Sequence, residues 1–153
     1  MTKSWIEKRD NVKGLPEVKE VSSKECKWGE GKMVIPSPRD VDALMHKVPK
    51  GKLTTTNELR NALAKKYHAD FTCPLTTGIF TWIAAGAAEE EKAAGKKNTT
   101  PYWRTLKKDG EVNSKYPGGV AAQRKLLVSE GHSVVTEGKK ILVVDYQKNL
   151  YIF

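Results

Sequence analysis

The chain has 153 residues, a formal net charge of +9 at pH 7 and only two cysteines. This length suits one domain, and the absence of a long apolar run argues against a signal peptide and a membrane-spanning helix. A basic excess is typical of proteins that bind polyanions, although charge alone does not identify a partner. Cys26 and Cys73 lie in no metal-ligand or redox spacing, so the sequence predicts no metal, no cofactor and a reducing, cytoplasmic setting.

Residues 1–34 are predicted to form an arm. The segment is rich in charge and glycine and shows no sustained hydrophobic period. Trp5 and Trp28 are large aromatic residues that could pin it onto a core. We expect a cover that docks on the domain, and the alternative is a basic tail that stays unfolded. Residues 33–36 fit either a short strand or an extended lead-in.

Two helices with clear start signals follow the arm. Ser37-Pro38-Arg39-Asp40 has the residues of a capping box with proline at the first helical position. Apolar residues at helical spacing continue the first helix through residues 41–48. Thr55 and Glu58 form a second capping box, which opens a helix that runs toward Lys66.

A turn over residues 67–72 is predicted to lead into a long helix from about Leu75 to Ala94. The two helices around this turn have the order of a helix-turn-helix, with the first half of the long helix in the recognition position. The small residues of the long helix would permit close approach of a neighbouring helix or of a nucleic-acid backbone. Its apolar face is predicted at Ile79, Trp82, Ile83 and Ala87.

The last third of the chain begins with a basic link, Lys96-Lys97-Asn98-Thr99-Thr100. Residues 105–112 are predicted to form two short strands around the Asp109-Gly110 turn, as a small wing. Gly118 or Gly119 is expected to begin the last core helix, with Val120 and Leu127 facing inward. A terminal β-hairpin is predicted over residues 133–153, with its turn at Glu137-Gly138. We expect it either to complete the fold or to cover an edge.

One segment between these elements resembles a known signature. Pro101-Tyr102-Trp103-Arg104 resembles the Pro-Cys-His-Arg motif of the alkylguanine–DNA alkyltransferases. A Gly118-Gly119 step and a Leu126-Leu127-Val128-Ser129-Glu130-Gly131-His132 run follow in that family's order and spacing, and the likeness covers about residues 41–132. The resemblance implies an α/β, mainly α, winged helix-turn-helix domain that binds DNA through the minor groove and extrudes an alkylated guanine. It divides the chain into an arm (1–34), this domain (35–132) and a hairpin extension (133–153).

The residues that carry the family's chemistry are replaced. Tyr102 stands at the position of the alkyl-accepting cysteine, and Trp103 stands at that of the histidine that draws off its proton. A phenol is mostly neutral at pH 7 and an indole has no basic nitrogen, so we expect no catalytic residue. Glu130 matches the family's glutamate but has no histidine to orient, and we expect it to hold the last helix. Cys73, at a helix start, is either a displaced nucleophile or, as we favour, a structural thiol.

Residues that would help to extrude a nucleotide also differ. The resemblance puts Thr56 where the family has a tyrosine and Thr77 where it has an arginine, and both substitutes are short. Basic residues and helix-start amides can still contact phosphates. The predicted DNA contacts are Thr54, Thr55, Thr56, Arg60, Thr76, Thr77, Lys96, Lys97 and Arg104. The predicted pocket consists of Tyr102, Trp103 and Glu130.

Two of these assignments have alternatives. Tyr102 and Trp103 either stack on an extruded base or simply fill the space of the former pocket. Arg104 is either a base contact or, as we favour, a structural ligand of loop carbonyls.

Three functions fit this sequence. The first is a non-catalytic, alkyltransferase-like protein that binds double-stranded DNA at alkylated or distorted sites, in connection with DNA repair. The second is a binding module in which the same fold has taken a protein or small-molecule partner. The third is an alkyltransferase that uses Cys73 or Tyr102 as its nucleophile. We favour the first because the scaffold and the basic composition are retained while the nucleophile and the base are lost.

Overall fold

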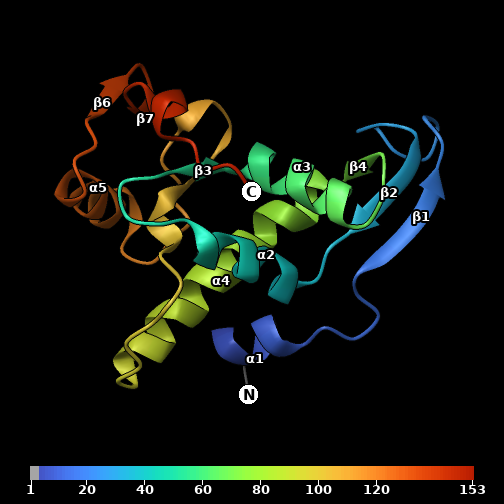
Figure 1. Ribbon diagram of the computed structural model, residues 1–153, viewed down its shortest axis with the longest axis horizontal. Helices are drawn as coiled ribbons and strands as arrows, with labels where there is room; N and C mark the ends of the chain where they lie inside the picture. The colour runs from blue at the N-terminus through green and yellow to red at the C-terminus, as the bar shows by residue number, and fades with distance from the viewer. Residues whose placement is uncertain (1–3) are drawn as a thin grey trace.

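The computed structural model describes residues 4–153 as a mixed α/β fold that is mainly helical. Its larger helices are α2 (Pro38–Lys47), α3 (Thr56–Lys66), α4 (Pro74–Ala93) and α5 (Gly119–Ser129). Helices α2 and α3 pack on α4, which runs through the middle of the molecule, and α5 lies beside the small C-terminal strands (Figure 1). No helix in this part of the chain is long and apolar enough to cross a membrane.

The helices begin where their capping residues predict. The Ser37 hydroxyl accepts a hydrogen bond from the Asp40 amide (3.1 Å), and the Asp40 carboxylate accepts one from the Ser37 amide (3.0 Å), which completes the capping box of α2. The Thr55 hydroxyl accepts a hydrogen bond from the Glu58 amide (3.2 Å) at the start of α3. These contacts satisfy amides that have no partner within the helix.

The core has two larger parts. The first lies between α2, α3 and α4, where Met45, Leu59 and Leu63 are fully buried against the alanines of α4. The second lies under α5 and the C-terminal strands and contains Leu106 and Leu127. The segment between α4 and α5 touches both parts, so its position is fixed from two sides.

The buried face of α4 differs from the predicted one. Ile79, Trp82 and Ile83 are only half-buried, and of the predicted face Ala87 alone is fully buried. The neighbouring helices approach α4 so closely that small side chains fill the contact. The buried residues of α4 are Thr77, Thr81, Ala84, Ala85, Gly86, Ala87 and Ala88.

The N-terminal segment packs on the domain, as expected for a docked cover. Helix α1 (Trp5–Asp10) packs on α4 and α2, and the Ile6 amide donates a hydrogen bond to Glu90 (2.8 Å). Trp5 is 40% exposed but lies against Gly86, and Trp28 is 42% exposed.

A small sheet continues this segment into the domain. Strand β1 (Glu17–Val21) pairs antiparallel with β2 (Gly31–Ile35), and β2 pairs in parallel with β4 (Phe71–Thr72), in the expected turn between α3 and α4. Strand β2 therefore crosses the predicted boundary at residue 34. The division of the chain at that residue stays a prediction.

The predicted two-stranded wing is wrong in its pairing. Strand β5 (Thr105–Leu106) pairs in parallel with β3 (Thr54–Thr55) and not with the residues after the turn. The Asp109-Gly110 turn is present, with φ of 64° and 82°. Beyond it, the Val112 amide donates to the carbonyl of Ile141 (2.8 Å). The segment after the turn therefore pairs with the C-terminal hairpin, because the backbone groups at the edge of that hairpin are available for hydrogen bonds.

The terminal hairpin has the predicted form. Strands β6 (Val134–Glu137) and β7 (Lys140–Val143) pair antiparallel around Gly138, whose φ is 63°. The chain then returns to Leu53, whose amide donates to Asn149 and whose carbonyl accepts from Tyr151, each at 2.8 Å. The terminal segment therefore covers the edge of the chain that enters β3.

Gly86→Ala tests the docking of α1. A Cβ atom at Gly86 would lie 2.4 Å from the Trp5 indole, whereas a Cβ atom at Gly78 in the same helix meets nothing within 4 Å. We expect Gly86→Ala to displace α1 and to lower the free energy of unfolding by about 1–3 kcal/mol. The control Gly78→Ala should raise it by about 0.5–1 kcal/mol, because alanine is the better helix former. Urea denaturation measures both, and equal effects would contradict the packing described.

Candidate functional site

Tyr102 is held inside the protein. Residues Tyr102–Arg104 form a 3₁₀ turn that leads into β5, and the pairing of β5 with β3 fixes the turn. The Tyr102 hydroxyl donates a hydrogen bond to Glu89 (2.6 Å), and its ring makes edge-to-face contacts with Trp103 and Tyr116. Tyr102 is only 3% exposed, so it fills this space. Of the two predicted alternatives, the structure favours filling over stacking on a base.

The environment of Tyr102 keeps its phenol neutral. Burial first, and then the hydrogen bond and charge of Glu89, raise the pKa of Tyr102 well above its ordinary value. A neutral phenol that already donates its proton to a carboxylate is a poor nucleophile. The geometry therefore argues against alkyl transfer to Tyr102.

Arg104 is a structural residue, as the sequence favoured. Its guanidinium donates two hydrogen bonds to the Glu130 carboxylate (2.9 and 2.6 Å) and a third to the Val48 carbonyl (2.8 Å). Both side chains are largely buried, at 13% and 7% exposure. Burial by itself raises the pKa of Glu130, but Arg104 outweighs it and holds that pKa below its usual range. Glu130 thus fastens the end of α5, which was its predicted role.

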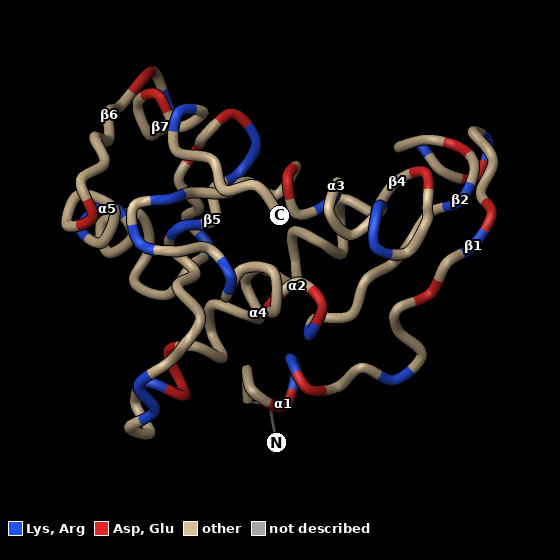
Figure 2. The backbone as a smooth tube through the Cα atoms, viewed as in Figure 1, with Lys and Arg blue, Asp and Glu red and all other residues tan. Residues whose placement is uncertain are grey.

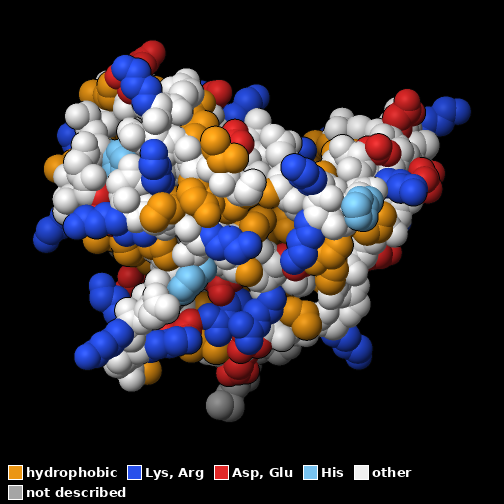
Figure 3. All heavy atoms as spheres, in the orientation of Figure 1, with side chains coloured by type: hydrophobic (Ala, Val, Ile, Leu, Met, Phe, Trp, Pro, Cys, Tyr) orange, Lys and Arg blue, Asp and Glu red, His pale blue; other side chains and the backbone are white. Residues whose placement is uncertain are grey.

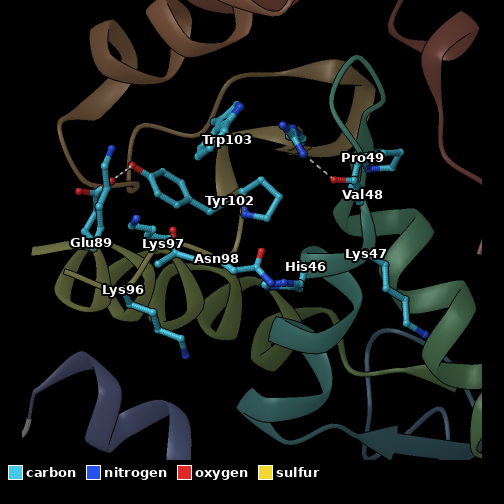
Figure 4. A pocket seen from close by; sticks show the side chains of 14 residues that line it. His46, Lys47, Val48, Pro49, Glu89, Lys96, Lys97, Asn98, Tyr102 and Trp103 are labelled. Atoms are coloured by element: carbon cyan, nitrogen blue, oxygen red, sulfur yellow. Dashed lines mark hydrogen bonds between the residues drawn. The ribbon is translucent and has the colours of Figure 1, made fainter. Parts of the chain in front are cut away.

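A cavity of about 560 Å³ opens beside Tyr102 and Trp103. One wall comes from the end of α2 and the loop after it (46–49), and the other comes from the end of α4 and the loop after it (Glu89, Lys92 and 96–99). Lys97 and Glu89 both line this cavity, and Figure 4 shows Lys47 and Lys96 extending away from the Tyr102 ring. The predicted residues Lys96, Lys97, Tyr102, Trp103 and Arg104 meet at this cavity.

The charge around the cavity is predominantly positive. Lys96 pairs with Glu91 and Arg104 with Glu130, but Lys47, Lys92 and Lys97 have no acidic partner within residues 4–153. Figure 2 shows lysines at the end of α4 and along the loop after α2, and on the face in Figure 3 basic side chains gather around the projecting end of α4. Such a surface suits an anionic ligand.

An exposed histidine in the wall of this cavity makes a hydrogen bond to Thr100. The Thr100 hydroxyl donates to Asp42 (2.6 Å), and its oxygen lies 3.2 Å from His46 Nδ1. The Thr100 hydroxyl donates its proton to Asp42, so His46 Nδ1 must be the donor to the Thr100 oxygen. The other ring nitrogen of His46, Nε2, then has no hydrogen-bond partner among these residues. His46 lines this cavity and an adjoining one of about 420 Å³ that reaches Arg9 and Arg39. Figure 4 shows the His46 and Asn98 side chains facing each other.

A third cavity lies on the other side of Tyr102. It has a volume of about 420 Å³ and a mainly apolar wall formed by Pro117, Ala122 and Leu126. Tyr102 and Glu89 border both this cavity and the basic one. The Tyr102–Glu89 pair is thus a partition between a basic and an apolar space.

Three of the predicted DNA contacts have buried side chains, and their contact with DNA stays a prediction. Thr54, Thr55 and Thr77 are 0%, 3% and 0% exposed, so their side chains do not reach the surface. Thr55 caps α3, and the Thr77 hydroxyl donates to the Cys73 carbonyl (2.7 Å). The parallel pairing of β3 with β5 places Thr54 in the interior.

The remaining predicted contacts fall into separate groups. Thr56 and Thr76 are half-buried near the starts of α3 and α4, and neither lines the basic cavity. Arg60 donates to the carbonyl of Thr72 (3.1 Å) and to Asn57 (3.2 Å), so it holds the helix-turn-helix together. Lys96 and Lys97 are exposed at the cavity. Contact of any of these residues with DNA stays a prediction.

The structure also adds residues that sequence reasoning missed. Asp42, His46 and Glu89 belong to the site through hydrogen bonds with Thr100 and Tyr102, and Lys92 lines the cavity. His46 follows the buried stripe of α2, and nothing in its local sequence marks it. Asp42 lies one helical turn before His46, and this i, i+4 spacing was the available signal.

Cys73 is a structural thiol, as favoured. It is 6% exposed and packs with Cys26 and Met33 beneath the small sheet. Its sulfur makes no capping hydrogen bond at the start of α4. Among residues 4–153, no group of three or more His, Cys, Asp or Glu side chains could hold a metal ion.

Comparison with known proteins gives a match in structure. No protein-family model matches the sequence, and no curated protein matches it. The crystal structure of S. pombe Atl1 in complex with damaged DNA containing O6-carboxymethylguanine is similar, with a TM-score of 0.51 and 15% sequence identity. The match covers 74% of this chain and 93% of that chain. This chain has the alkyltransferase-like fold. The predicted fold class is therefore confirmed.

Glu130→Gln tests the central ion pair of this alkyltransferase-like fold. Removing the carboxylate charge leaves Arg104 buried without its counter-ion, so we expect a loss of about 3 kcal/mol in the free energy of unfolding at neutral pH. Because the folded-state pKa of Glu130 is lowered, its contribution is present above the ordinary value of about 4.3 and is lost as the pH falls below it. The difference between wild type and variant should therefore shrink on acidification. Denaturant titrations over this pH range measure it, with the exposed Glu17→Gln as control, and a pH-independent difference would contradict the assignment.

Proposed function

We propose that this protein is a non-catalytic, alkyltransferase-like protein that binds double-stranded DNA and recognises alkylated or distorted sites in connection with DNA repair. The observation that carries the proposal is the basic cavity beside Tyr102 and Trp103, in a fold shared with a protein that was crystallised on damaged DNA. Unpaired lysines around that cavity would contact phosphates, and the cavity would receive the altered nucleotide.

The loss of alkyl transfer follows from the groups present. Tyr102 is buried and hydrogen-bonded to Glu89, and Trp103 has no basic nitrogen. Cys73 is buried in a different part of the molecule, in contact with Cys26 and Met33. Arg104 and Glu130 form a bidentate ion pair with each other. The positions of Tyr102 and Trp103 therefore border a binding space but supply neither a thiolate nor a basic nitrogen.

Helix α1 leaves both ends of α4 uncovered. Helix α1 packs against α4 near Gly86, whereas Leu75, at the start of α4, is 57% exposed. The projecting end of α4, with Lys92, is also exposed. Both ends of α4 are thus accessible to a duplex, as a helix-turn-helix protein requires.

Salt dependence of DNA binding tests the proposal. We expect duplex DNA to bind with an affinity that falls linearly in a log-log plot against salt, because each phosphate contact releases counter-ions. Replacement of Lys92 and Lys97 by Gln should lower this slope by about one per lysine. Lys19→Gln on β1, which lies far from the projecting end of α4 in Figure 1, should leave it unchanged. Fluorescence anisotropy measures the slopes, and absence of binding at low salt would instead favour a protein or small-molecule partner.

Intact-mass analysis tests the absence of alkyl transfer. After incubation with DNA that contains O6-methylguanine, the protein should show no added methyl mass, because the phenol at Tyr102 stays neutral and Cys73 is buried. Recovery of unaltered O6-methylguanine from the DNA is the matching readout. A mass increase that disappears in Cys73→Ser or Tyr102→Phe would identify a nucleophile and refute the non-catalytic assignment.

A further inference from the structure

We infer that Arg9, in the N-terminal arm, is a positioning residue for the basic cavity. It fixes the loop of residues 96–100 (the cavity loop), which forms part of the wall of that cavity, although no residue of α1 lines it. Docking of the arm and binding of DNA are therefore coupled. The coupling to DNA rests on the proposed function, whereas the effect of Arg9 on the cavity loop concerns the free protein.

Helix α1 docks through a charged residue. Arg9 is the buried residue of this helix, at 8% exposure, whereas Trp5 is 40% exposed. An apolar side chain gains from contact with any apolar surface, but a buried guanidinium needs hydrogen-bond acceptors at particular positions. The helix has six residues, which are too few to make it stable on its own. Its position therefore depends on the carboxylates that Arg9 meets.

Arg9 meets two carboxylates that belong to different helices. Its Nη1 atom contacts Glu91 of α4 and lies 3.8 Å from Asp42 of α2, and α1 packs on both helices (Figure 1). The side chains of Glu91 and Asp42 are 11% and 13% exposed, so solvent screens their charges only weakly. Without the guanidinium, two negative charges would repel each other in a partly buried space. Arg9 therefore holds α2 and α4 together at this point.

The same two carboxylates fasten the cavity loop. Glu91 accepts a hydrogen bond from the Lys96 ammonium (2.5 Å), and Asp42 accepts one from the Thr100 hydroxyl (2.6 Å). Lys96 begins the loop and Thr100 ends it, so both of its ends are held by groups that Arg9 contacts. When Arg9 is lost, the carboxylates should move apart, and the two ends of the loop should move with them. The wall of the basic cavity thus depends on a residue outside it.

Two variants displace α1 by different means. Arg9→Gln removes the counter-ion of the carboxylates. Gly86→Ala changes no charge and displaces the helix through the Trp5 indole. Arg9→Lys keeps the charge but lacks the planar fork of donors, so it should retain part of the wild-type behaviour. The control, Lys13→Gln, removes one positive charge from an exposed position of the arm.

Hydrogen exchange of the free proteins tests the position of the cavity loop. The amides of Lys96 and Tyr102 donate to the carbonyls of Glu91 (3.0 Å) and Thr100 (2.9 Å), at the two ends of the loop. The reference is the amide of Val112, which belongs to the second part of the core. In both displacing variants, we expect exchange at Lys96 and Tyr102 to rise about threefold to tenfold more than at Val112, because the loop opens locally. The control should show no such difference.

Fluorescence anisotropy with duplex DNA tests the coupling. We expect both displacing variants to bind DNA about fivefold to tenfold more weakly than the wild type, as is usual for coupled sites. The control should change the affinity by less than about twofold, because solvent and salt screen an exposed charge. Coupling is reciprocal, so DNA should slow exchange of the Asn11 amide, which donates to the Glu7 carbonyl (3.0 Å) at the end of α1.

The outcomes separate this inference from the proposed function. Equal changes in exchange at the cavity loop and at Val112 would overturn the positioning role of Arg9, because they would show only a general loss of stability. A loosened loop with unchanged DNA affinity, or an equal loss of affinity in Lys13→Gln, would overturn the coupling and leave the proposed function intact. Failure of the wild type to bind any duplex would refute the proposed function and the coupling, while the exchange rates would still decide the role of Arg9.

Discussion

The architecture of the site depends on the bidentate ion pair between Arg104 and Glu130. Arg104 belongs to the turn after Tyr102, Glu130 ends α5, and the third hydrogen bond of Arg104 goes to Val48 at the end of α2. One guanidinium thus joins three segments that are far apart in the sequence. A buried pair of this kind contributes little net stability compared with apolar packing, but loss of one partner is costly. Its main effect is to fix where the turn stands, and with it the wall of the basic cavity.

Tyr102 shapes the site as well as lacking the chemistry of a thiol. The tyrosine ring occupies the space between the basic cavity and the apolar one, and Glu89 holds its hydroxyl. Glu89 comes from the second half of α4, within the stretch that contacts α1 through Gly86 and Glu90. The same helix therefore supplies the close-packed centre of the molecule, the anchor of Tyr102 and, through Lys92, part of the basic wall. Substitutions along α4 should couple stability to the shape of the site.

The local signals of the sequence predicted where helices begin, but they did not predict the strand pairing or the residues that meet at the site. Capping residues such as Ser37 and Thr55 act over three residues, and they placed the helix starts correctly. The wing was misplaced because the partner of β5 is β3, some fifty residues earlier, and no local pattern encodes a parallel pairing of two residues. The buried face of α4 was misjudged for a related reason: helix packing selected its small residues, while periodicity alone pointed to Ile79, Trp82 and Ile83.

The same limit separates contacts that a short motif can carry from contacts that packing decides. Arg104 and Glu130 are paired through their own side chains, so a motif that retains both residues carries the contact with it. Thr77 was placed by its position in a helix-turn-helix, but its exposure depends on the rotation of α4 about its axis. That rotation is set by the contacts of α4 with α1, α2 and α3. His46 was missed because its role arises from Thr100, which is 54 residues later in the sequence. The Thr100 hydroxyl lies between His46 Nδ1 and the Asp42 carboxylate. The site is assembled from α2, the end of α4 and the turn Tyr102–Arg104. These segments meet only in the folded protein, so the positive charge around the cavity cannot be read from any one of them.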